Sequence, residues 1–180
     1  MATWMKKTYN AEGVTAYPTG PNLAHLKERF GGSGAVVLCI DVSGSMKGED
    51  LEEAKKGGSG FIADAAGGGY QVGLILWNND IAGAVAPTSD IASVQHALDE
   101  AVARGYTNLA PALELASSML MERDVTDRVC VVFTDGALMD QVDAESAAER
   151  MKAAGIRILT MGLGSVAARG LASIASDHSL

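Results

Sequence analysis

The sequence predicts an α/β fold with a doubly wound, mostly parallel central sheet, one antiparallel edge strand and helices on both faces. Short apolar runs typical of buried strands alternate with longer stretches of helical periodicity over most of the chain. Two of these runs end in an aspartate beside small residues, as at the ligand-binding edge of such sheets. The 180 residues are 48% hydrophobic and 5% aromatic, which fits one domain with a mainly aliphatic core.

An N-terminal arm of residues 1–34 precedes the domain, which we expect to span 35–180. In the arm, Pro18 lies in a turn signal, and Asn22 is placed to cap a short helix over 23–30. The apolar residues of this helix share one face, so we expect the arm to dock on its own domain. The glycine-rich stretch that follows is typical of a flexible joint or of a tight lead into the first strand.

The domain itself alternates strands and helices. We expect strands over 35–41, 70–77, 128–134 and 156–161, and helices over 47–66, 90–103, 109–123, 143–154 and 167–176. Residues 81–86 form an added edge strand, which should run antiparallel to its neighbour because the connection 78–80 is tight. The first helix contains Gly57, Gly58 and Gly60, so it either breaks there or packs closely on the sheet.

Oxygen-bearing side chains gather where the first strand ends. Asp41, Ser43 and Ser45 occupy alternating positions directly after the apolar run 35–40. Hard divalent cations such as Mg²⁺ take oxygen ligands, and a tight loop can bring these three oxygens to one ion. A plain helix N-cap is the alternative for the serines, because their hydroxyls satisfy free amides at helix starts.

Two further segments supply more oxygens. Asp135 follows the apolar run 129–133 and so occupies the same place relative to its strand as Asp41. Thr107 lies in a polar loop ahead of the helix over 109–123. Taken singly, these residues fit an ordinary turn and a loop hydroxyl. Because ligands bind at the carboxyl ends of strands in doubly wound sheets, the joint pattern predicts that three loops meet at one metal ion.

The pattern Asp-x-Ser-x-Ser, a later Thr and Phe-Thr-Asp-Gly resembles the metal-ion-dependent adhesion site (MIDAS) of von Willebrand factor type A (VWA) domains, here of the stand-alone intracellular type. The order and spacing of the elements agree from about Ala35 to Ile174. The resemblance implies Mg²⁺, with Mn²⁺ as the alternative, and the following ligands: Asp41, Ser43, Ser45, Thr107 and Asp135. The hydroxyls would touch the ion directly and the aspartates through water, which lets a partner's Glu or Asp complete the coordination.

The resemblance implies metal-dependent protein binding rather than turnover. Intracellular VWA proteins often serve as subunits of larger assemblies, including those driven by AAA+ ATPases, so such an ATPase or another complex is an expected partner. Two alternatives stay open: a structural subunit in which the ion only joins the loops, and a metal-dependent hydrolase. The family usually has a sixth strand, whereas this chain ends at Leu180, so one sheet edge is short, open or covered by the arm.

Charge and composition exclude some classes of binding partner. The formal net charge is −8, and four basic against two acidic residues give the arm +2, so residues 35–180 carry −10. This negative charge disfavours binding to nucleic acid, because such binding depends on Lys and Arg side chains that neutralise the phosphates. No apolar run reaches the ~20 residues that span a bilayer, and the N-terminus lacks the pattern of a secretory signal. We therefore expect a cytoplasmic protein with no membrane partner.

The cysteines and the other motifs favour no further chemistry. Cys39 and Cys130 fall in buried strands, where a free thiol behaves as a small hydrophobe, with a disulfide between neighbouring strands as the alternative. A haloacid dehalogenase-like phosphotransferase needs an acid where Ser43 stands. Residues 162–167 look like a dinucleotide-binding loop but lack the acid expected roughly 20 residues later. No Gly-x-Ser-x-Gly surrounds Ser43, so we do not expect an enzyme.

Overall fold

The structure of the chain is a computed structural model, which describes residues 34–135, 138–162 and 171–176. Its elements are, in chain order, β1 (Gly34–Asp41), the 3₁₀ turn η2 (Gly44–Met46), α2 (Glu49–Gly67), β2 (Tyr70–Trp77), β3 (Ile81–Thr88), α3 (Ile91–Asp99), α4 (Ala110–Met121), β4 (Asp127–Thr134), α5 (Gln141–Ala153) and β5 (Arg157–Gly162). The arm, with the helix expected over 23–30, lies outside the described residues, as do residues 167–170 of the last expected helix.

A five-stranded sheet in the order β3-β2-β1-β4-β5 forms the middle of the domain. The pairs β1–β2, β1–β4 and β4–β5 are parallel, whereas β3 runs antiparallel to β2. The registers Asp41↔Trp77 and Ile40↔Phe133 align the carboxyl ends of the three central strands. The predicted doubly wound sheet with one antiparallel edge strand is confirmed, and the strands that lead to Asp41 and Asp135 are neighbours.

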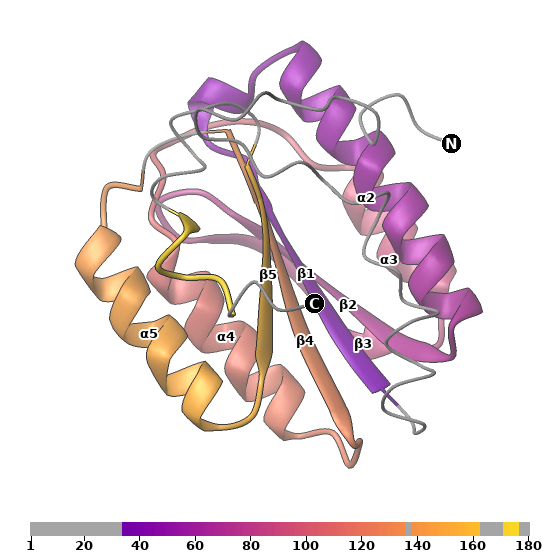
Figure 1. The fold of residues 1–180 in the computed structure, drawn as a ribbon. Coiled ribbons are helices and arrows are strands. Elements are labelled where there is room, and N and C mark those ends of the chain that lie inside the picture. The colour runs from indigo at the N-terminus through magenta and orange to yellow at the C-terminus, as the bar shows by residue number, and fades with distance from the viewer. Residues whose placement is uncertain (1–33, 136–137, 163–170, 177–180) are drawn as a thin grey trace, which may run out of the picture.

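Helices cover both faces of the sheet, with α2 and α3 on one face and α4 and α5 on the other (Figure 1). Successive residues of β1 serve two separate cores, because side chains alternate between the faces of a strand. Leu38 and Ile40 belong to the core that contains Phe61 of α2. Val37 belongs to the second core, with Leu113 of α4. The central strand is therefore buried on both faces, as its continuous apolar run predicts.

Helix α2 continues without a break through Gly57, Gly58 and Gly60. A Cβ atom built on Gly58 would lie 2.9 Å from Ile40 Cδ1 and 3.1 Å from Leu98 Cδ2, so the missing side chain lets the helix lie close to β1 and α3. A glycine costs up to about 1 kcal/mol relative to alanine in a helix interior. The helix therefore does not break at these glycines, and at Gly58 the small residue allows close packing.

Helix α3 ends earlier than expected, at Asp99. Residues 100–109, whose alanines continue the apolar pattern, instead form a loop across the carboxyl edge of the sheet. Ala103 is buried, and the following amide, Arg104 N, donates to Val42 O at 2.7 Å. The alanines at these positions are therefore apolar because the loop packs against the sheet, and not because the helix continues.

The outer edge of β5 is partly covered by residues 171–176, which are mainly turns. Ser176 donates its backbone amide to Ile158 O at 2.9 Å, and its hydroxyl accepts from Ile158 N at 2.8 Å. Leu171 and Ile174 from the same segment are buried in the core beside α4 and α5. At this point of the strand, the segment satisfies the backbone groups that a neighbouring strand would otherwise bond.

The two cysteines lie in neighbouring strands as free, buried thiols. The Sγ atoms of Cys39 and Cys130 are 3.7 Å apart and share a hydrogen bond. This bond, together with burial, raises the pKa of Cys39 well above its ordinary value. The interpretation of both residues as core thiols is confirmed.

Candidate metal site at the carboxyl edge of the sheet

Asp41 is the last residue of β1 and is fully buried. Its Oδ1 accepts a hydrogen bond from Ser43 N at 2.7 Å, and its Oδ2 accepts one from the Thr134 hydroxyl at 2.5 Å. These bonds fix the orientation of the carboxylate. Since each oxygen has more than one lone pair, both can still accept from a bound water or ligate an ion.

Ser43 and Ser45 lie in the turn between β1 and α2. Ser43 precedes η2, but its hydroxyl makes no capping bond, and the residue before α2 is Gly48. The two serine hydroxyls are instead 3.0 Å apart, and the Ser45 hydroxyl donates to Asp135 Oδ1 at 3.0 Å. The alternative of a plain N-cap is therefore wrong for these serines, whose hydroxyls connect the first loop to the second aspartate.

The loop of residues 100–109 lies directly against this turn. Gly44 N donates to Gly105 O at 2.9 Å. Gly105 has a φ of +84°, and a Cβ atom there would lie 2.5 Å from Asn79 Oδ1, so the close approach requires glycine. Thr107 follows two residues later and is 8% exposed. The structure thus joins Asp41, Ser43, Ser45 and Asp135 through hydrogen bonds and places Thr107 in the adjoining loop.

Burial raises the pKa of both aspartates. For Asp41, the hydrogen bonds from Thr134 and Ser43 offset this rise only in part, and the charge of Asp135 adds to it. For Asp135, the bond from Ser45 lowers the pKa and the charge of Asp50 raises it. Within the described part of the chain, no Lys or Arg side chain forms an ion pair with either carboxylate. The described residues therefore leave the negative charge at this edge without a basic partner.

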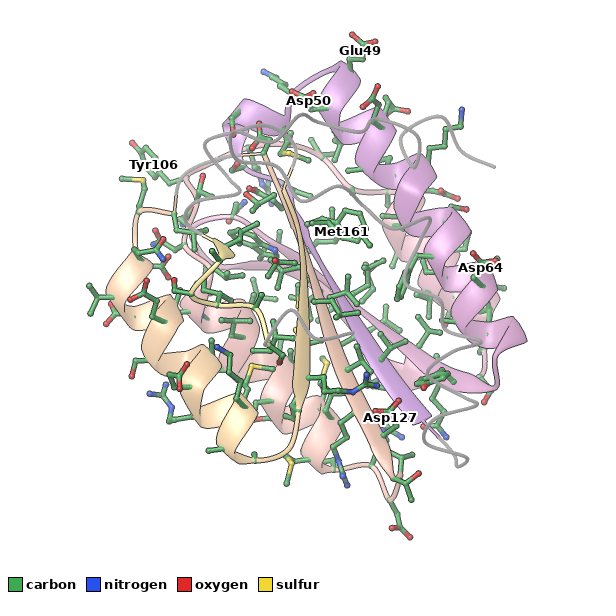
Figure 2. The ribbon with its side chains drawn as sticks, in the orientation of Figure 1. Glu49, Asp50, Asp64, Tyr106, Asp127 and Met161 are labelled. Carbon is green, nitrogen blue, oxygen red and sulfur yellow. The ribbon has the colours of Figure 1, made fainter. Side chains whose placement is uncertain are left out.

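The second buried aspartate of the described residues, Asp127, lies at the opposite end of the sheet, and there the charge has a partner. Asp127 accepts bonds of 2.6 and 2.7 Å from Arg157 Nη2 and a bond of 2.5 Å from the Tyr70 hydroxyl. Burial first, and then the bond to Asp127, raise the pKa of Tyr70. Figure 2 shows Asp127 far from Asp50, which lies at the end of the sheet that carries Asp41. Among the described residues, the carboxyl edge is therefore where two carboxylates lie close together without a basic partner.

The donor set fits a hard divalent cation. It consists of two carboxylates and three hydroxyls from three loops, and oxygen donors are the ligands that Mg²⁺ and Mn²⁺ take in octahedral sites. The described residues contain no group of three or more His, Cys, Asp or Glu side chains that could hold a metal, so the hydroxyls are essential to this assignment. Two carboxylates balance a double positive charge and leave coordination positions for water or a ligand.

Two supporting residues were not among the sequence candidates. Thr134 bonds Asp41 across the strands, and its place next to Asp135 at the end of an apolar run is a signal that the sequence does contain. Asp140 accepts hydrogen bonds from Leu109 N at 2.9 Å and from Ala110 N at 2.7 Å, and so caps the start of α4. Nothing in the local sequence indicates that Asp140 caps α4, because this helix lies far from Asp140 along the chain.

The sequence profile of the von Willebrand factor type A domain matches residues 35–179. The chain belongs to this family. The family resemblance drawn from the motif is thereby confirmed, and the match covers all the strands and helices described above except Gly34, the first residue of β1. No curated protein matches the chain.

Solved structures with similar folds include other VWA-like proteins. BatB, a conserved hypothetical protein from Bacteroides thetaiotaomicron, is 25% identical, with a TM-score of 0.63 over 71% of this chain and 65% of that chain. An aerotolerance-related membrane protein from Bacteroides fragilis is 26% identical, with a TM-score of 0.60 over 72% and 67%. Proximal thread matrix protein 1 from the mussel byssus, solved with a zinc-occupied MIDAS motif, is 19% identical, with a TM-score of 0.67 over 81% and 39%.

This chain spans less than two thirds of the BatB structure and 39% of the mussel protein, which at its level of identity is similar in fold alone. Among the helices described in this chain, none is both long and apolar enough to cross a membrane.

Proposed function

We propose that this VWA domain binds Mg²⁺, or Mn²⁺ in its place, and uses the ion to capture a Glu or Asp side chain of a protein partner. The ligands are Asp41, Ser43, Ser45, Thr107 and Asp135. The partner is a subunit of a larger cytoplasmic assembly, for which an AAA+ ATPase is a candidate, and the domain performs no turnover. The family's general role in protein interaction supports the proposal.

One observation carries most of the argument. The Asp41 carboxylate is fully buried, and the hydroxyl pair Ser43–Ser45 links its loop to the Asp135 carboxylate, yet no described basic side chain neutralises either charge. A buried carboxylate is costly unless a cation or hydrogen bonds compensate it. A divalent cation between these loops would provide the compensation that Arg157 provides for Asp127 at the other end of the sheet.

Capture of a partner carboxylate follows from the charges. The chain carries a net −8, so its overall field repels an acidic partner. Attraction must then be local to the ion, which keeps its electrophilic character because only two protein ligands are anionic. A carboxylate from the partner would fill an open coordination position and add an oxygen of the kind that the ion prefers.

A purely structural ion is the second candidate. The backbone bonds from Arg104 N to Val42 O and from Gly44 N to Gly105 O already join two of the three loops. An ion is therefore not needed to hold these loops together, which supports the capture function over the structural one. Under the structural alternative, Asp41→Ala would lower stability and leave partner binding unchanged.

Metal binding is tested by calorimetric titration of metal-stripped protein with MgCl₂. We expect one site in the wild type and at least about tenfold weaker binding in Asp135→Asn and Ser45→Ala. Asp64→Asn, in the exposed part of α2, and Ser118→Ala, on the outside of α4, are matched controls that should bind like the wild type. Equal binding by all four variants would contradict the assignment of the ligands.

Partner capture is tested by a pull-down from lysate of the source cells. Wild type and Asp41→Ala are compared with Mg²⁺ and with EDTA, after circular dichroism has shown that both are folded. We expect a partner that is lost both on chelation and on mutation. Partners that persist in all conditions would show that the ion plays no part in recognition.

A further inference from the structure

Large apolar side chains are exposed around the candidate metal site. Among the described residues, five large apolar side chains are half or more exposed: Val102 68%, Tyr106 68%, Met121 50%, Met139 68% and Val142 77%. Four of the five lie in the two segments that flank the site, namely the loop that carries Thr107 and the segment that follows Asp135. Only Met121, at the far end of α4, lies elsewhere.

Three of these residues form what we term the apolar rim: Tyr106, Met139 and Val142. Tyr106 directly precedes the candidate ligand Thr107. The Met139 amide donates to the Thr107 carbonyl at 2.9 Å, which brings the two segments together beside the site. Val142 lies three residues further on, in the first turn of α5. Figure 2 shows Tyr106 projecting outward from this end of the domain.

The apolar rim stands on a fixed base. Asp140, which lies between Met139 and Val142, accepts hydrogen bonds from Leu109 N and Ala110 N at the start of α4. These bonds and the one between Met139 and Thr107 join the two segments at three points. The rim side chains are therefore held outward by an ordered backbone, and a partner can bury them without first ordering the loop.

The opposite border of the site has a different character. Glu49 and Asp50, at the start of α2, are both exposed (Figure 2). Asp50 is close enough for its charge to act on Asp135. A second acidic side chain of a partner would be repelled on this side, while the other side offers apolar surface. The two borders therefore select for a segment with one acid and an apolar neighbour.

On the basis of the proposed function, we propose that the apolar rim determines partner specificity, by binding a segment in which a single Asp or Glu stands within two residues of a large aliphatic or aromatic side chain. The carboxylate is directed to the ion, and the apolar side chain covers Tyr106 and Met139. Two residues of extended chain span about 7 Å, so one segment can place its carboxylate at the ion and its apolar side chain on the adjacent rim. Exposed apolar patches on soluble domains commonly mark such binding surfaces.

A phage-displayed library of random peptides, selected on the Mg²⁺-loaded wild type and eluted with EDTA, tests this proposal. We expect the enriched peptides to carry one acid beside a large apolar residue. A synthetic copy of the most enriched peptide should bind Tyr106→Ser and Met139→Ser about tenfold or more weakly than the wild type. Both variants should keep wild-type Mg²⁺ affinity. Met121→Ser, which removes an exposed apolar side chain away from the site, should bind the peptide like the wild type.

The outcomes separate this inference from the proposed function. A wild type that does not bind Mg²⁺ would overturn the proposed function and, with it, the inference. Peptides that need Mg²⁺ but bind Tyr106→Ser and Met139→Ser as tightly as the wild type would overturn the inference alone. Enrichment of acidic runs without apolar residues, or no EDTA-sensitive enrichment on Mg²⁺-loaded protein, would also overturn it.

Discussion

Replacing Asp140 by alanine is expected to destabilise the domain and weaken metal binding, although Asp140 is not a candidate ligand. Its carboxylate bonds Leu109 N and Ala110 N, two of the amides that have no partner inside α4. Loss of a capping side chain costs about 0.5–2 kcal/mol, and loss of negative charge at a helix start costs about 0.3–1 kcal/mol. We therefore expect a loss of about 2 kcal/mol, which lowers the Tm of a domain of this size by about 4–8 °C.

The metal affinity should fall with the stability, because Thr107 lies only two residues before Leu109 at the capped start of α4. Urea unfolding of the metal-free protein measures the first effect, and titration with Mg²⁺ measures the second, for which we expect a loss of about tenfold. Asp140→Asn keeps one acceptor oxygen and should lose about half as much stability. Asp143→Ala, which removes an exposed carboxylate from the first turn of α5, is the control. If Asp140→Ala matches Asp143→Ala in both measurements, the two hydrogen bonds have no energetic role and the reasoning fails.

Three further predictions concern the metal-free protein. Asp41→Asn should abolish Mg²⁺ binding without lowering stability in EDTA, because the amide oxygen can accept from Ser43 N, the amide NH₂ can donate to the Thr134 hydroxyl, and a buried charge is removed; a large loss in urea unfolding would contradict this. Since burial raises the folded-state pKa of Asp41 and Asp135 above 3.8, the folded state binds more protons than the unfolded chain. Metal-free wild type should therefore lose stability as pH rises from about 4 through these pKa values, and saturating Mg²⁺ should reverse the slope; an unchanged slope would refute the argument. Gly105→Ala should weaken Mg²⁺ binding by displacing the loop, whereas Gly155→Ala, which shares the positive φ but has open space around it, should lose only the ~1–2 kcal/mol of backbone strain. Equal Mg²⁺ affinity in the two variants would show that the close approach at Gly105 is irrelevant.

The strands could be predicted from the sequence because their environment is simple. β1 and β4 are buried on both faces and read as continuous apolar runs. β3 is only half buried, and its tight connection to β2, rather than its composition, predicts its direction. The end of α3 could not be predicted, because a buried alanine looks the same in a sequence whether a helix or a crossing loop buries it.

In the candidate site, too, the contacts between residues close in sequence could be predicted, whereas some of those between distant segments could not. Asp41, Ser43 and Ser45 are close in sequence, and their spacing alone indicates a shared ligand. That Asp135 lies beside them follows from the strand order, which the α/β pattern makes expected. The cap supplied by Asp140 depends on the packing of α4 against α5, which no short segment encodes.

The carboxylates at the two ends of the sheet are compensated in different ways. Asp127 has a permanent counter-ion in Arg157, so the protein itself supplies the positive charge that compensates this carboxylate. Under the proposed function, Asp41 and Asp135 take their counter-ion from solution, and this ion would stabilise the fold by about 2.7 kcal/mol at a free concentration 100 times its Kd. The supply of divalent cation would then set the folded fraction of the protein, and with it the rate at which proteases remove the metal-free form.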